Sequence, residues 1–269
     1  GFMNVGWSGS DDGETTQGLF ALFFGHNWKI TPKLTLDYGL RYENISSKGF
    51  NSIAEPNPRQ GDASFGGRDG DPLTLWDNGG GTAGAPINYD YNLNSFSYTA
   101  GLNYKFSDEK AIYARFARGN KSPSTFFYLD LNSDFLVENT PALLEEITQF
   151  EIGYKLNTDN LKLVATPFYS HLNNVPNIQT FSNEDGTRYS PLFQFAEYTT
   201  FGIEFETTYK ITDKWLVRTN AVFQNSKADK YTAWDEGEDG PTDDSIVDYS
   251  GNEADNAANV IFNINPIYN

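Results

Sequence analysis

The sequence predicts an all-β protein that forms a section of a large transmembrane up-and-down β-barrel. We expect about nine antiparallel strands, short periplasmic turns and long extracellular loops. Three observations lead to this expectation. Apolar and polar residues alternate over long stretches, short and long connections alternate along the chain, and charged residues recur on one face of the expected strands.

The clearest alternation runs from residue 96 to residue 119. The first strand places one set of side chains on one face, namely Phe96, Tyr98, Ala100, Leu102, Tyr104 and Phe106. Ser97, Thr99, Gly101, Asn103 and Lys105 point the other way, because successive side chains of a strand face opposite sides. Each strand here is about 10 to 12 residues long, whereas globular strands average about 5 to 6. A tilted strand needs about 9 to 11 residues to cross a bilayer, so this length favours a membrane barrel.

Connections of two lengths alternate along the whole chain. Further strands are expected at 17–28, 34–44, 148–156, 161–172, 195–210, 215–225 and from 258, and a helical turn is expected around 141–146. Short connections follow Trp28, Phe106, Leu156 and Lys210, whereas long ones follow Asn44, Gly119, Leu172 and Asn225. Alternate connections of an up-and-down barrel lie at the same rim. The pattern therefore predicts short turns at one rim and long loops at the other, as in outer-membrane barrels.

Eight charged residues fall on the polar faces of these strands. They are Arg41, Glu43, Arg115, Glu151, Lys155, Glu204, Glu206 and Arg218. Unpaired charges make poor core residues, since burying a charge is costly. We therefore expect these side chains to line a wet or plugged lumen rather than the core of a soluble sandwich.

The composition excludes several classes of protein. The net charge of -17 and the pI near 4.4 argue against nucleic-acid binding, which needs a basic surface. The chain has no cysteine, so a disulfide or a thiolate nucleophile is excluded. Aromatic residues make up 16% of a chain whose mean hydropathy is only -0.54, as expected for strands that are half polar. The first residues lack the basic start and apolar run of a secretory signal, and we expect the chain to begin inside a longer one.

Four motifs resemble TonB-dependent outer-membrane receptors. WKITPKL at 28–34, followed by YGLRYE at 38–43, is similar to a mid-barrel hairpin of that family. AIYARFARGNKSP at 111–123 and ITQFEIGYK at 147–155 resemble two of its strands, and 202–208 with the turn ITDKW resembles another. The four motifs occur in the right order and the resemblance extends over most of the chain, although the loops match nothing that we can name.

The resemblance implies a barrel of about 22 strands occluded by an N-terminal plug. We therefore expect residues 1–269 to be part of the receptor β-barrel, with the plug and the barrel closure outside this chain. It also implies the bacterial outer membrane with the long loops outside, and no enzymatic activity. The implied partners are membrane lipid or lipopolysaccharide, a TonB-type inner-membrane energy coupler acting through the plug, and a small-molecule or oligomeric ligand. A surface lipoprotein is a further candidate partner.

The implied function is energised uptake of a scarce nutrient captured by the extracellular loops. The nutrient could be a metal chelate, a corrinoid, a glycan or a peptide. Two alternatives stay open at this point. One is a non-transport outer-membrane barrel, such as an adhesin or an assembly component, and the other is a soluble β enzyme or lectin.

Several smaller motifs are candidates for ligand-binding or metal-binding sites. Aromatic residues in the long connections are candidate ligand contacts, namely Trp76, Tyr89, Tyr91, Phe127, Tyr128 and Trp234. DEGEDG at 235–240 partly resembles a calcium loop, so Asp235 and Asp239 on the loop 226–256 are candidate calcium ligands, and no other cofactor is expected. His26 and His171 lie on separate expected strands, which argues against a His-dependent catalytic or metal site.

Overall fold

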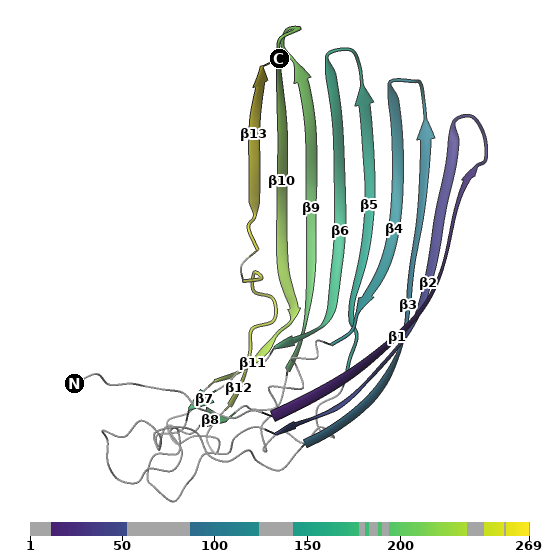
Figure 1. Cartoon of the computed structure of the whole chain (residues 1–269). Coiled ribbons are helices and arrows are strands. Elements are labelled where there is room, and N and C mark those ends of the chain that lie inside the picture. Colours follow the sequence, from purple (N-terminus) through teal and green to yellow (C-terminus); the bar gives the residue numbers. More distant parts are fainter. Residues whose placement is uncertain are drawn as a thin grey trace, which may run out of the picture.

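One large antiparallel sheet dominates the structure. The computed structural model describes residues 12–52, 87–123, 142–177, 181–182, 188–189, 194–235, 245–255 and 257–268. The sheet comprises β1 (Asp12–Lys29), β2 (Leu34–Ser52), β3 (Ile87–Lys105), β4 (Lys110–Lys121), β5 (Glu145–Asn157), β6 (Leu161–Asn177), β9 (Gln194–Lys210), β10 (Trp215–Lys230) and β13 (Val260–Tyr268). They pair in this order, each strand with the next along the list (Figure 1). The expectation of nine antiparallel strands is confirmed.

Two small hairpins lie outside the main sheet. β7 (Phe181–Ser182) pairs with β8 (Arg188–Tyr189), and β11 (Thr232–Asp235) pairs with β12 (Ser245–Asp248). The described part of the chain holds no helix that is long and apolar enough to cross a membrane.

The four short connections all lie at one end of the sheet, which we call the turn end (Figure 1). They span residues 30–33, 106–109, 158–160 and 211–214. In three of them a threonine hydroxyl accepts a hydrogen bond from the backbone N–H three residues later. Thr31 Oγ1 accepts from Leu34 at 3.0 Å, and Thr158 and Thr212 do the same for Leu161 and Trp215 at 3.1 Å. These hydroxyls replace backbone partners that a tight turn leaves unpaired.

The opposite end, which we call the loop end, carries the long connections, as predicted. The strands reach further towards it than we expected from the sequence. β2 continues to Ser52 and β3 starts at Ile87, so part of the expected long loop is strand. The helical turn expected around 141–146 was wrong for the described residues. Residues 142–144 have no regular structure, and Glu145 and Glu146 begin β5, paired with Lys121 and Asn120.

The sheet has two chemically distinct faces, defined by the register. We call the face with Tyr98, Leu102 and Tyr104 the outer face, and the face with Thr99 and Asn103 the inner face. Many outer-face rings fall into two levels, although others, such as Tyr38 and Phe205, lie between them. The level nearer the loop end contains Tyr42, Phe96, Phe116, Phe150, Tyr169, Phe201 and Phe223, and the level nearer the turn end contains Trp28, Tyr104, Tyr154, Tyr209, Trp215 and Tyr268.

The spacing of the two aromatic levels is close to the thickness of a bilayer on some strands. Phe96 and Tyr104 are eight residues apart on β3, as are Phe201 and Tyr209 on β9, whereas Phe150 and Tyr154 on β5 are only four apart. Eight residues span about 27 Å along a strand, and a tilt of about 35–45° reduces this to about 20 Å across the bilayer. The apolar band of outer-membrane barrels is about 25 Å tall and is bordered by aromatic girdles. On β3 and β9 the outer face therefore has roughly the dimensions of a surface that meets lipid.

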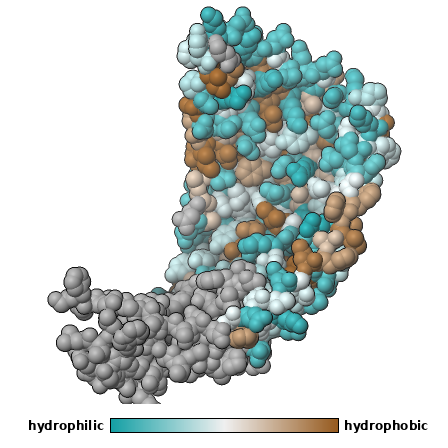
Figure 2. Space-filling view, in the orientation of Figure 1, coloured by the Kyte–Doolittle hydropathy of each residue, from teal (hydrophilic) through white to brown (hydrophobic). Residues whose placement is uncertain are grey.

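The polarity of the outer face changes directly beyond the aromatic level nearer the loop end. Two residues further towards the loop end, every one of these strands carries a polar side chain. These residues are Asn44, Asn94, Arg118, Thr148, His171, Thr199 and Asn225. The inner face changes in the opposite sense, and Ile45 and Tyr89 are only 5% and 4% exposed there. In the space-filling view, in which the turn end is at the top, hydrophilic residues predominate over the part of the strands nearer the turn end, with hydrophobic residues scattered among them (Figure 2).

A charge on the outer face should destabilise the folded barrel far more than the same charge one residue away. Leu102 is 43% exposed on the outer face, and Asn103 follows it on the inner face. We expect Leu102→Arg to cost about 2–4 kcal/mol, because the guanidinium would lie in hydrocarbon. The equilibrium of the full-length protein between folded and denaturant-unfolded states in lipid vesicles measures this cost. Asn103→Arg is the control and should cost less than about 1 kcal/mol. Equal costs would contradict the assignment of the two faces.

Candidate functional site

The register places all eight predicted lumen residues on the inner face. Arg115 on β4 lies directly opposite Glu151 on β5. Lys155 lies opposite Val164 of β6, and Val164 lies opposite Glu206 on β9. Arg41, Glu43, Glu204 and Arg218 occupy the same face by the same ladder. The register thus shows that the eight residues share one face, and their position along a lumen stays a prediction.

The inner face carries four cationic and four acidic side chains from this set. Arg41 and Glu43 form an ion pair along β2, with Nη2 and Oε1 2.5 Å apart. Arg115 donates through Nε to Thr99 Oγ1 at 3.4 Å. Lys155 Nζ lies 4.5 Å from the centre of the Tyr113 ring, which is close enough for a cation–π contact. This set therefore contains equal numbers of positive and negative groups rather than charges of one sign.

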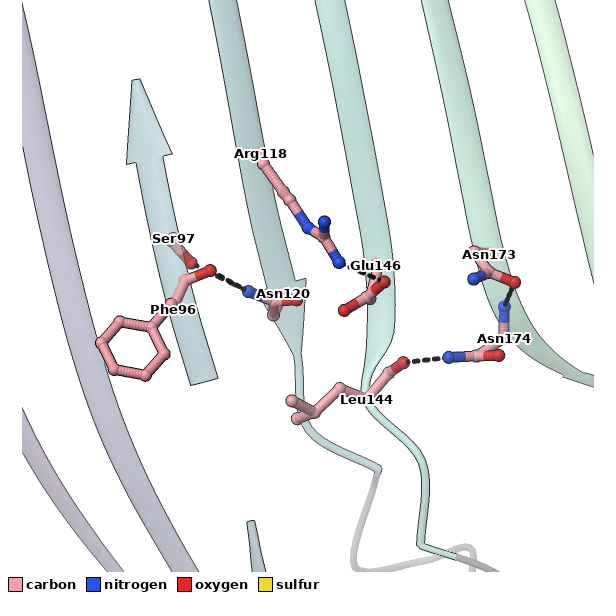
Figure 3. A network of polar contacts seen from close by, with 8 residues as sticks. All are labelled: Phe96, Ser97, Arg118, Asn120, Leu144, Glu146, Asn173 and Asn174. Atoms are coloured by element: carbon pink, nitrogen blue, oxygen red, sulfur yellow. Dashed lines mark hydrogen bonds and ion pairs between the residues drawn. The ribbon is translucent and has the colours of Figure 1, made fainter. Parts of the chain in front are cut away.

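A polar network covers the outer face at the loop end (Figure 3). Arg118 donates through Nη2 to Glu146 Oε2 at 2.7 Å. This pairing raises the pKa of the Arg118 guanidinium, chiefly through the hydrogen bond to Glu146. The ladder between β3 and β4 ends at Tyr98 and Arg118. Beyond that point, the Asn120 amide donates to Phe96 O at 2.8 Å and substitutes for the missing backbone bond.

One cluster on this outer face contains the residue types of a catalytic triad without its geometry. His171 Nδ1 lies 3.1 Å from Thr199 Oγ1 and 3.4 Å from Asp229 Oδ2, and the Thr199 hydroxyl also bonds to Asp229. A triad needs the nucleophile and the carboxylate on different ring nitrogens, so that one accepts a proton while the other orients the ring. Here both partners meet the same nitrogen, so the cluster cannot act as a triad. His26 lies on β1, well separated along the sheet from His171 on β6.

The predicted loop aromatics divide into two groups. Trp76, Phe127 and Tyr128 lie outside the described residues, as does Asp239. Tyr89 and Tyr91 do not lie in a loop as expected, because they belong to the extension of β3. Their rings are stacked 6.4 Å apart on the inner face. Trp234 lies in β11 and is half-buried.

A tyrosine cluster at the loop end was missed by the sequence analysis. The ring of Tyr231 lies 6.4 Å from that of Tyr198 and 5.8 Å from that of Tyr249. Burial raises the pKa of the Tyr198 phenol, and the nearby Tyr231 and Asp255 raise it further. Tyr198 therefore stays neutral at physiological pH and presents a hydroxyl donor. Tyr198 belongs to the inner face, because it lies opposite Leu172 and Ala228.

The hairpin of β11 and β12 is fixed to the wall beside this cluster. Thr232 Oγ1 bonds to Gln194 Oε1 at 2.9 Å, and the Asn177 amide donates to Thr232 O at 3.3 Å. Tyr249 N donates to Tyr231 O at 2.8 Å. These bonds fix the cluster at the loop end of the inner face.

No group of three or more potential metal ligands occurs among the residues that the structure describes. Asp235 lies at the end of β11. Hydrogen bonds from Ser250 lower the pKa of the nearby Asp248, first through its hydroxyl and then through its backbone N–H. The Asp248 carboxylate accepts a hydrogen bond from Ser250 N and so fixes the start of the segment that follows β12.

Comparisons with known proteins agree on one family. The family model described as "TonB dependent receptor-like, beta-barrel" matches residues 2–268. The rhizobactin receptor of Rhizobium meliloti (strain 1021) is 28% identical over 156 residues, which cover 54% of this chain and 19% of that protein.

Two solved structures share the fold. The siderophore receptor PiuA from Acinetobacter baumannii gives a TM-score of 0.64 at 20% identity, covering 96% of this chain and 32% of that one. The ferric yersiniabactin uptake receptor FyuA from Yersinia pestis gives 0.61 at 16% identity, with the same coverage. The chain thus spans about a fifth of the curated relative and about a third of these structures.

Removing one hydroxyl should loosen the hairpin that carries Tyr231 and Tyr249. Thr232→Val deletes the bond to Gln194 while keeping the side-chain shape, so we expect a loss of about 1 kcal/mol locally. Amide hydrogen exchange should become about fivefold faster in β11 and β12, and the main sheet should be unaffected. Thr212→Val, in a turn at the far end, is the control and should leave the hairpin unchanged. Unchanged exchange in Thr232→Val would show that the bond does not hold the hairpin.

Proposed function

Because the chain belongs to the TonB-dependent receptor β-barrel family, we propose that it forms part of the wall of an outer-membrane receptor that imports a metal chelate. We further propose a ferric siderophore as the cargo. The family is one of transport receptors, so membership agrees with the expectation that the chain is not an enzyme. It does not favour the alternative of a non-transport barrel such as an adhesin.

The outer face supports a membrane location with the loop end outside. Its apolar band is bordered by two aromatic levels, and polar side chains begin directly beyond the level nearer the loop end. The turn end has connections of only three or four residues, which is typical of the periplasmic side, whereas long connections are typical of the exterior. In this orientation the tyrosine cluster faces incoming cargo, and the plug and the TonB-type coupler act from the periplasmic side.

The inner face favours cargo of low net charge. The eight predicted lumen residues comprise four cations and four carboxylates, so this set neither attracts nor repels one sign strongly. The net charge of -17 adds a field that opposes strongly anionic molecules. A metal chelate in which the ligand balances the charge of the metal, as three hydroxamates do for Fe(III), suits both conditions. Among the similar structures one is a siderophore receptor and another takes up a ferric compound, which also favours this class over corrinoids, glycans and peptides.

The observation that carries the proposal is the tyrosine cluster of Tyr198, Tyr231 and Tyr249 on the inner side of the loop end. Aromatic rings with neutral hydroxyl groups can stack on a planar ligand and donate hydrogen bonds to its oxygens. Such contacts suit an organic chelate better than a bare cation, which would need converging carboxylates.

Uptake by the full-length receptor tests this proposal. Cells that express it should accumulate radioactive iron from at least one member of a panel of ferric hydroxamate, catecholate and carboxylate siderophores. A protonophore should abolish accumulation and leave surface binding intact, because only import needs energy. Tyr231→Ala combined with Tyr249→Ala should weaken binding about tenfold, through lost ring contacts.

Trp215→Ala, at the turn end of the outer face, is the matched control and should bind normally. Accumulation of cyanocobalamin but of no ferric siderophore would move the cargo to another class. Failure to bind or accumulate any nutrient of the four classes would contradict transport itself.

A further inference from the structure

The inner face contains glycines whose missing side chain is replaced by an aromatic ring from the neighbouring strand. The best-defined case joins Gly153 on β5 to Tyr113 on β4, which lie directly opposite each other. A Cβ atom on Gly153 would lie 1.9 Å from Tyr113 Cε1 and 2.2 Å from its Cζ. The ring therefore lies flat against the backbone of β5, in space that any larger residue would occupy.

The same ring reaches a third strand. The Tyr113 hydroxyl lies 2.9 Å from Thr166 Oγ1 on β6, so one side chain bridges β4, β5 and β6. Lys155 Nζ lies 4.5 Å from the ring centre. The Tyr113 ring is thus fixed by contact with the backbone at Gly153, by the hydrogen bond of its hydroxyl to Thr166 and by the ammonium group of Lys155.

This bridge lies where the ladder between β5 and β6 is interrupted. Pairing runs through Glu151 with Phe168 and resumes at Tyr154 with Ala165, and the two positions between them are skipped. One of the skipped residues is Pro167, which has no N–H to donate. Ladder bonds are costly to lose within a bilayer, because lipid offers no alternative partner. The hydroxyl bond from Tyr113 to Thr166 joins β6 to the rest of the sheet at this weak point.

A second site repeats the arrangement of residue types. Tyr89 on β3 lies opposite Gly49 on β2, and a Cβ on Gly49 would lie 2.6 Å from the Tyr89 hydroxyl. That hydroxyl bonds to Thr15 Oγ1 on β1, across the width of β2. A third site lacks the hydroxyl. Phe168 on β6 covers Gly202 on β9, where a Cβ would lie 2.4 Å from the ring.

We propose that Tyr113 and Tyr89 act as three-strand clasps of the barrel wall, with Phe168 as a shorter version without the terminal bond. Each clasp holds adjacent strands in register and keeps its ring flat against the wall, so that the ring does not project into the interior. Glycine in a strand interior weakens the strand, and a covering ring restores the lost packing. This proposal concerns the wall and does not depend on the nature of the cargo.

A mutant cycle on the full-length receptor in lipid vesicles tests the Tyr113 clasp. Gly153→Ala should accelerate unfolding in denaturant about tenfold, because the new methyl group displaces the ring. In the Tyr113→Ala background the same change should have little effect, since no ring remains to be displaced. Gly153 is the informative position, because a Cβ added to Gly49 or Gly202 would also lie only 2.0 or 2.8 Å from a backbone oxygen of a neighbouring strand.

The terminal bond is tested by a second cycle. Tyr113→Phe and Thr166→Val should each accelerate unfolding about threefold, and the double variant no more than either one, because both delete the same bond. Gly39→Ala is the matched control on the inner face, since its Cβ would meet neighbours at an ordinary 3.4 Å.

Two results would overturn the proposal. One is that Gly153→Ala is equally harmful with and without Tyr113, and the other is that it is no more harmful than Gly39→Ala. Should Gly153→Ala fail to fold at all, the readout becomes the yield of folded barrel, which Tyr113→Ala must then restore. Transport assays play no part in these outcomes, so they stay distinct from a failure of the proposed function.

Discussion

The whole structure depends on pairing every backbone N–H and C=O group without help from solvent. Lipid provides no hydrogen-bonding partner, so a chain that crosses it with strands must form one uninterrupted ladder. Within the nine-stranded sheet, antiparallel neighbours meet this demand except along the outward edges of β1 and β13. Where the backbone ladder between two strands stops, side chains join the strands instead. The Asn120 amide donates to a backbone oxygen at the end of the β3–β4 ladder, and the side-chain bond from Tyr113 to Thr166 joins β4 to β6 beside Pro167.

A change of solvent along the strands explains the pattern of polarity. Within the bilayer, apolar residues must point outwards and polar ones inwards. Beyond the head groups the outside is water, and the preference of the outer face reverses. Tyr42 and Asn44 mark this boundary on β2, and Tyr169 and His171 mark it on β6. The strands continue past the boundary, so in the proposed orientation their loop ends extend beyond the bilayer, with Tyr89 and Tyr91 on the inner side.

The fold could be predicted because the membrane imposes a strict period of two. The residues from Phe96 to Phe106 display it without exception, and the repeated ITPK and ITDK turns mark where it stops. The strand ends were missed where the phase of this period changes. Residues 87–94 alternate as strictly as 96–106, but their apolar side chains lie on the inner face, so the sequence analysis took this stretch for part of a loop. The extension of β2 and β3 was hidden by this inversion.

The site could be predicted only in part. The shared face of residues such as Arg115 and Glu151 follows from parity along each strand. Contacts across strands follow from register, which a single sequence does not display. The Tyr113–Gly153 contact is therefore invisible until β4 and β5 are aligned. The tyrosine cluster was missed because Tyr231 and Tyr249 lie in an acidic stretch that reads as a solvated loop.

The most direct test of a membrane-spanning wall is cysteine scanning from Tyr98 to Asn103 in the full-length receptor in outer membranes. This chain contributes no native cysteine, so each introduced thiol reports its own surroundings. A wall with one face in lipid predicts strict alternation of thiol reactivity along the strand. Thiols at 99, 101 and 103 should react with a water-soluble maleimide, and those at 98, 100 and 102 should react only with a lipid-soluble one. Uniform reactivity with the water-soluble reagent at all six positions would contradict it.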